Sequence, residues 1–60
     1  MLILIAGKQA ALRNALRNFL QRRPGLEIAG TAANKAELMS LVAADSPDLL
    51  LLDENLAEDL

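Results

Sequence analysis

The side chains best suited to chemistry follow two apolar runs of this 60-residue chain. Gly7 and Lys8 come directly after "LILIA", and Asp53 comes directly after four leucines. A carboxylate at a strand end can act as a nucleophile or a metal ligand, and Lys8 beside free backbone N–H groups could attract an anion. Each residue also has a structural interpretation, in which Gly7 makes a turn, Lys8 is solvated and Asp53 caps the next segment.

The apolar pattern alternates between strand and helix. Two uninterrupted apolar runs predict strands buried on both faces, because successive side chains of a strand point to opposite sides. Between them lies an apolar stripe at helical spacing (Leu12, Ala15, Leu16, Phe19 and Leu20). The expected elements are a strand at 2–6, a helix at 10–23, a strand at 26–31, a helix at 35–45 and a strand at 48–53.

This order predicts an α/β fold with a parallel sheet, because parallel strands need helical crossovers. In the flavodoxin-like, doubly wound arrangement the strand order is 2-1-3, and the ligand site lies at the carboxyl ends of strands 1 and 3. We therefore expect Gly7 and Lys8 to lie beside Asp53, Glu54 and Asn55. The sheet is either complete with three strands or the first half of a larger one.

The composition narrows the classes of function. The chain has no cysteine and no histidine, which excludes a disulfide and a zinc site, and its net charge of −2 argues against general affinity for nucleic acids. No signal peptide or membrane span is expected, so the predicted location is cytoplasmic. The segment "AGKQ" is not a phosphate-binding loop, because Leu2 and Gln9 occupy the positions that need glycine and Ser or Thr.

The segment "ALRNALRNFLQRRPGLEIAGTAANKAELMSLVAADSPDLLLLD" resembles the first half of a response-regulator receiver domain, of the type that precedes a LuxR-type helix-turn-helix. The similarity covers residues 2–55 and includes the "P-x-[LIV]-E-[VI]-x-G-x-A" and "P-D-[LIV]-x-[LIV]-x-D" spacings. It implies a CheY-like fold, Asp53 as the aspartate that accepts a phosphoryl group from a histidine kinase, and Asn55 at the position whose carbonyl binds Mg²⁺. DNA would be bound only through an output domain that these residues do not include.

The chain departs from the family where Gly7 and Lys8 replace the usual pair of acids after the first strand. Those acids hold the magnesium that supports phosphoryl transfer, so Mg²⁺ binding is doubtful here and no cofactor is expected. We expect Lys8 to form an ion pair with Asp53, standing where the cation would stand. The leading hypothesis is a non-enzymatic receiver module of a transcriptional regulator with impaired aspartyl phosphorylation.

Two alternatives remain open. One is an interaction module, because the leucine strand would be a bare sheet edge in a chain of this length and would favour a homo-oligomer. The other is weak binding of an anion or nucleotide at the start of the first helix.

Overall fold

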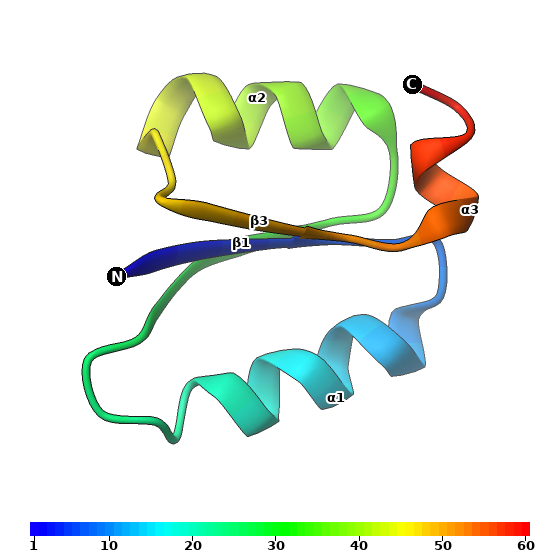
Figure 1. The fold of residues 1–60 in the computed structure, drawn as a ribbon. Coiled ribbons are helices and arrows are strands. Elements are labelled where there is room, and N and C mark those ends of the chain that lie inside the picture. The colour runs from blue at the N-terminus through cyan, green and yellow to red at the C-terminus, as the bar shows by residue number, and fades with distance from the viewer.

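The structure is a computed structural model that describes residues 1–60. Three strands alternate with three helices along the chain (Figure 1). The elements are β1 (Leu2–Ala6), α1 (Ala10–Leu20), β2 (Glu27–Ala32), α2 (Lys35–Asp45), β3 (Leu49–Leu52) and α3 (Glu54–Ala57).

The sheet is parallel with the strand order β2-β1-β3, which confirms the predicted α/β fold class. α1 covers one face of the sheet and α2 covers the other, while α3 lies at the carboxyl end of β3 (Figure 1). This is the arrangement of part of a flavodoxin-like receiver fold. Since β1 is central, its carboxyl end has a neighbour on each side.

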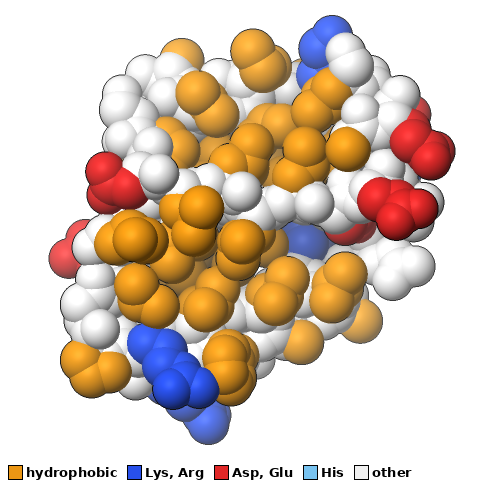
Figure 2. Space-filling view, viewed as in Figure 1, with side chains coloured by type: hydrophobic (Ala, Val, Ile, Leu, Met, Phe, Trp, Pro, Cys, Tyr) orange, Lys and Arg blue, Asp and Glu red, His pale blue; other side chains and the backbone are white.

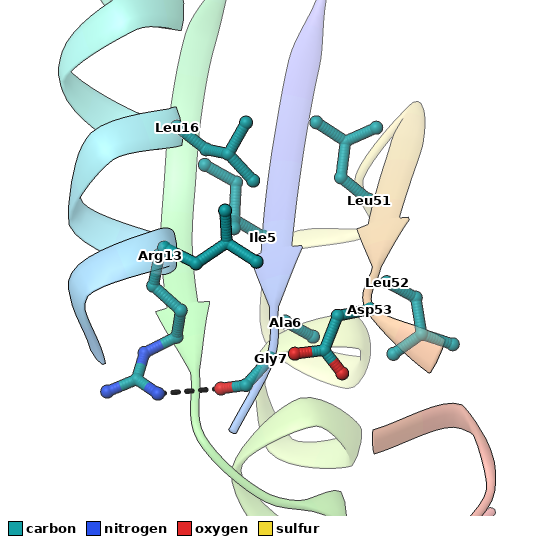
Figure 3. A pocket seen from close by; sticks show the side chains of 9 residues that line it. Ile5, Ala6, Gly7, Arg13, Leu16, Leu51, Leu52 and Asp53 are labelled. Carbon is teal, nitrogen blue, oxygen red and sulfur yellow. Dashed lines mark hydrogen bonds between the residues drawn. The ribbon is translucent and has the colours of Figure 1, made fainter. Parts of the chain in front are cut away.

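β1 forms the centre of the core because both of its faces are covered. Ile3, Leu4, Ile5 and Ala6 are all buried. Alternate residues point to opposite faces. On one face Leu4 and Ala6 belong to a buried cluster, whose other members are Ala32, Leu38 and Leu56. On the other face Ile5 lies near Leu16 of α1 (Figure 3).

α1 ends at Leu20, three residues before the expected end. Arg23 N donates to the Leu20 carbonyl at 3.0 Å, a short-range bond that tightens the last turn. Pro24 disfavours the helical conformation for the residue before it, and Gly25 then turns the chain with a φ of +82°. The Arg23 guanidinium lies 4.5 Å from the centre of the Phe19 ring.

The expectation that the leucine run is buried on both faces was wrong for its first half. Leu49 and Leu50 are 42% and 37% exposed, and only Leu51 and Leu52 are partly buried. The reason is that β3 is an edge strand of this sheet, and the helices pack mainly against β1 and β2. No helix has the length and apolar character that crossing a membrane requires.

Candidate functional site

The candidate site lies at the rim where β1 and β3 end side by side. Asp53 N donates to the Ala6 carbonyl at 3.1 Å, and Gly7 N donates to the Ala32 carbonyl at 2.9 Å. These backbone bonds continue the parallel register, in which Ala6 pairs with Leu52. The prediction that topology brings Gly7 and Lys8 next to Asp53 therefore agrees with the geometry of this rim.

The Asp53 carboxylate is bound by two backbone N–H groups. Its Oδ1 accepts from Leu56 N at 2.7 Å, and its Oδ2 accepts from Lys8 N at 3.1 Å. The first bond makes Asp53 the N-cap of α3, with Glu54 as an acid in the first turn. The second bond ties the loop after β1 to the end of β3. Asp53 thus has the structural role of a cap at the position where the receiver resemblance places a phosphoacceptor.

Gly7 is buried against this carboxylate. A Cβ atom at position 7 would lie 2.6 Å from Asp53 Oδ2, which is too close for atoms that are not bonded, and 3.2 Å from its Cγ, which is a tight contact. The φ of Gly7 is not positive, since Gly25 is the one glycine with a positive φ. The rim therefore requires glycine here for space rather than for backbone conformation.

Lys8 does not form the expected ion pair with Asp53. Its Nζ lies 2.6 Å from Asp59 Oδ2. The backbone N–H of Lys8 faces Asp53, so its side chain leaves the rim in another direction, where the turn after α3 brings Asp59 within reach. The hydrogen bond to Asp59 raises the Lys8 pKa above its usual value, with smaller contributions from the charges of Asp53 and Glu58. Both side chains are about half exposed, so this pair adds little stability.

Arg13 belongs to the site although it lies outside the apolar stripe of the first helix. Its Nη1 donates to the Gly7 carbonyl at 2.6 Å (Figure 3). A cavity of about 260 Å³ lies between α1 and β3 and is lined largely by apolar side chains, with Arg13 and Asp53 at its polar end. The sequence feature that could have indicated this contact is the position of Arg13, in the first turn of the helix that follows Gly7.

The rim does not fit the magnesium ion that the receiver resemblance implies. Mg²⁺ prefers carboxylate and carbonyl oxygens, but Gly7 has no side chain and Lys8 brings a cation. No group of three or more acidic, histidine or cysteine side chains is placed to hold a metal ion. Asn55 is exposed in α3, and its role in metal binding stays a prediction. Anion binding at the start of α1 also stays a prediction, and the Lys8 ammonium is engaged by Asp59.

No family model and no solved structure matches the chain. The chain is similar to a protein-glutamate methylesterase/protein-glutamine glutaminase of Geobacillus kaustophilus (strain HTA426), with 37% identity over 51 residues. The match covers 85% of this chain but 15% of that relative, so the chain spans a small part of the relative's length. The expectation of a non-enzymatic protein is corrected by this finding, because the relative is named as an enzyme. Together with the β2-β1-β3 sheet, the similarity supports a receiver-like unit with a signal-receiver role.

Proposed function

We propose that this chain is a signal-receiver module of a two-component regulator in which Asp53 holds the phosphoacceptor position and Mg²⁺-dependent phosphorylation is impaired. The observation that carries this proposal is the position of the Asp53 carboxylate and the hydrogen bonds that it accepts. It lies at the shared rim of β1 and β3, and backbone N–H groups of Lys8 and Leu56 bind its two oxygens. Gly7 and Lys8 occupy the two positions where carboxylates would be needed to hold a metal ion.

The electrostatics of the rim explain why transfer would be slow. In phosphoryl transfer to an aspartate, a carboxylate oxygen forms a bond to phosphorus, while the bond from phosphorus to the donor breaks and the donor keeps the electron pair. The transition state spreads negative charge over the phosphoryl oxygens, and positive groups must compensate this charge. Lys8 is the cationic residue whose backbone lies next to Asp53, but its ammonium contacts Asp59. The two backbone N–H groups that bind Asp53 are dipoles rather than full charges.

The proposed partner is a histidine kinase, and the proposed wider context is a transcriptional regulator with a LuxR-type output domain. Both follow from the resemblance of residues 2–55 to the receiver family. The similarity to the methylesterase supports the receiver role, and it leaves the type of output domain as part of the proposal. DNA contact is assigned to an output domain and not to these residues, whose net charge is −2.

The test is phosphorylation by acetyl phosphate with Mg²⁺, followed by intact mass spectrometry. We expect the unmodified chain to gain far less than one phosphoryl group per molecule, and an Asp53→Asn variant to show whether any adduct lies on Asp53. Stoichiometric labelling of Asp53 would contradict the proposal.

A second measurement tests Mg²⁺ binding on its own, without phosphoryl transfer. Lys8→Asp restores one acid at the rim, and we expect it to bind Mg²⁺ at least about tenfold more tightly than the unmodified chain, measured by NMR titration. Arg22→Asp is the matched control, because it makes the same change of charge after the end of α1, at the opposite end of the sheet from the rim. Equal Mg²⁺ affinity of the two variants would show that position 8 does not limit metal binding.

A further inference from the structure

The peptide unit between Gly7 and Lys8 is held by side chains at both of its polar groups. Its carbonyl oxygen accepts from Arg13 Nη1 at 2.6 Å, and its N–H group donates to Asp53 Oδ2 at 3.1 Å. Arg13 and Asp53 lie on opposite sides of Gly7 (Figure 3). Since Arg13 belongs to α1 and Asp53 follows β3, a single peptide unit joins these two elements.

The planarity of the peptide bond links these two hydrogen bonds. The peptide is trans, so its carbonyl oxygen and its N–H hydrogen lie in one plane and point in opposite directions. A rotation that moves the Gly7 carbonyl away from Arg13 also turns the N–H group of Lys8 away from Asp53. The guanidinium charge adds to this link, because a charged donor polarises the peptide and makes its N–H group a stronger donor.

The Gly7 carbonyl depends on Arg13 for its hydrogen bond. Gly7 is buried, and no backbone N–H group donates to its carbonyl. A buried carbonyl that lacks a donor raises the free energy of the folded chain. Arg13 is accordingly partly buried, whereas the polar residues that follow it in α1 are exposed: Asn14, Arg17 and Asn18.

The end of the molecule around Asp53 is rich in negative charge. Three further acids follow Asp53 in the sequence: Glu54, Glu58 and Asp59. Figure 2 shows acidic side chains at the end of the molecule where α3 lies. The Lys8 ammonium contacts Asp59 rather than Asp53. The positive charge of Arg13 reaches Asp53 through the peptide between them, without a direct ion pair.

We propose that Arg13 is a positioning residue for the Asp53 carboxylate. It fixes the orientation of the peptide between Gly7 and Lys8, and so keeps the N–H group of Lys8 against Asp53 Oδ2. The other oxygen of Asp53 caps α3, so Arg13 also links α1 to the start of α3. This inference rests on the proposed function for the importance of Asp53, and it names the residue that determines how firmly the carboxylate is held.

Amide hydrogen exchange at Lys8, measured by NMR, tests this role. In Arg13→Met we expect the Lys8 amide to exchange roughly threefold faster or more, since an ordinary hydrogen bond corresponds to a factor of about 2–12 in an equilibrium constant. Arg17→Met is the matched control, because Arg17 is exposed on the next turn of α1. Equal exchange rates at Lys8 in the two variants would overturn the proposal. Loop amides exchange by local opening, so a loss of global stability leaves the Lys8 rate unchanged while the β1 amides still exchange more slowly.

A double-mutant cycle with Asp53→Asn shows whether Arg13 acts through this hydrogen bond. Asparagine is a good N-cap and keeps an oxygen for Leu56 N, but its NH₂ group cannot accept from Lys8 N. We expect Asp53→Asn to speed exchange at Lys8, and Arg13→Met to add no further increase in that background. Multiplied effects in the double variant would refute the link. Arg13→Ala, which introduces the best helix former, serves the same purpose if circular dichroism shows that Arg13→Met does not fold.

Neither measurement involves a phosphoryl group. Equal exchange in the Arg13 and Arg17 variants would therefore overturn the role of Arg13 and leave the proposed function standing. Stoichiometric phosphorylation of Asp53 would contradict the proposed function and leave the link from Arg13 to Asp53 standing.

Discussion

Replacing Gly7 by alanine tests whether the rim is built around the Asp53 carboxylate. The new Cβ would lie 2.6 Å from Asp53 Oδ2, and this contact forces the carboxylate to move. The movement breaks the bond from Lys8 N and weakens the cap on Leu56 N. Losing a cap costs about 0.5–2 kcal/mol, and a further hydrogen bond contributes about 0.5–1.5 kcal/mol. Since Asp53 is partly exposed and water can replace some of this bonding, we expect a net loss of about 1–2 kcal/mol.

Thermal unfolding followed by circular dichroism at fixed protein concentration measures this loss. For a domain of this size about 1–2 kcal/mol corresponds to a decrease in Tm of roughly 4–16 °C. Gly30→Ala is a suitable control, because its Cβ would meet the flexible end of the Leu41 side chain at 3.3 Å, which can shift at small cost. We expect a much smaller change in Tm for that variant.

A double-mutant cycle with Asp53→Ala makes the test decisive. When the Asp53 carboxylate is absent, Gly7→Ala no longer has an oxygen to displace. Its remaining effect is the reduced freedom of the unfolded chain, which stabilises a protein by about 0.4–1 kcal/mol where the backbone conformation suits alanine. The effect of Gly7→Ala should therefore change sign between the two backgrounds. An equal loss of stability in both would refute the inference that Gly7 exists to make room for Asp53.

Three further changes test the packing around this site and the end of α2. Ser46 ends α2 with a φ of +47°, so Ser46→Gly should raise the free energy of unfolding by about 0.5–1 kcal/mol, read from the urea midpoint; an unchanged midpoint would show that this residue is not strained. Leu56 is 1% exposed, and Leu56→Ala should cost about 2–5 kcal/mol and leave little folded protein by circular dichroism, whereas Leu60→Ala should cost little. The contact with Asp59 raises the Lys8 pKa above 10.5, so the stability from this contact is present in full below that pH and is lost as the pH rises through the raised pKa. The difference in Tm between the unmodified chain and Lys8→Met should accordingly be constant from neutral to mildly alkaline pH and vanish at higher pH, and a difference that persists there would assign the effect to packing.

The fold class could be predicted because the pattern of apolar residues determines most of it. Two apolar runs separated by amphipathic segments are consistent with a parallel sheet whose strands are joined by helices. In the structure β1 is the central strand and is buried, as this arrangement requires. The exposure of Leu49 and Leu50 does not follow from the apolar pattern, but it agrees with the alternative expectation that this strand is a sheet edge. An apolar run reports that a strand suits burial, but the number of neighbouring strands decides whether it is buried.

The position of the candidate site and the capping role of Asp53 could be predicted, but the contacts of Lys8 and Arg13 could not. The carboxyl ends of β1 and β3 meet because of topology, which the order of elements implies. The partner of Lys8 depends on α3, and a four-residue helix is too short to show an apolar period. The sequence feature that could have indicated α3 is Asp53 followed by Glu54, which is an N-cap residue before an acid in the first turn. That signal predicts a helix start, and the turn after the helix brings Asp59 to Lys8.

The contacts of Asp53 connect the stability of this chain with its proposed weak phosphorylation. An anion at a partly buried rim needs compensation, and here backbone N–H groups of Lys8 and Leu56 provide it. This arrangement requires the carboxylate to lie against Gly7, and a side chain at position 7 would displace it. A carboxylate side chain at position 7, as a metal site would need, and a capped α3 are therefore competing uses of the same space. The sequence has Gly7 where the metal site would need an acid, so the chain favours the arrangement in which Asp53 caps α3. Phosphorylation of Asp53 would take a carboxylate oxygen away from its N–H donor, and the free energy of that hydrogen bond opposes the reaction.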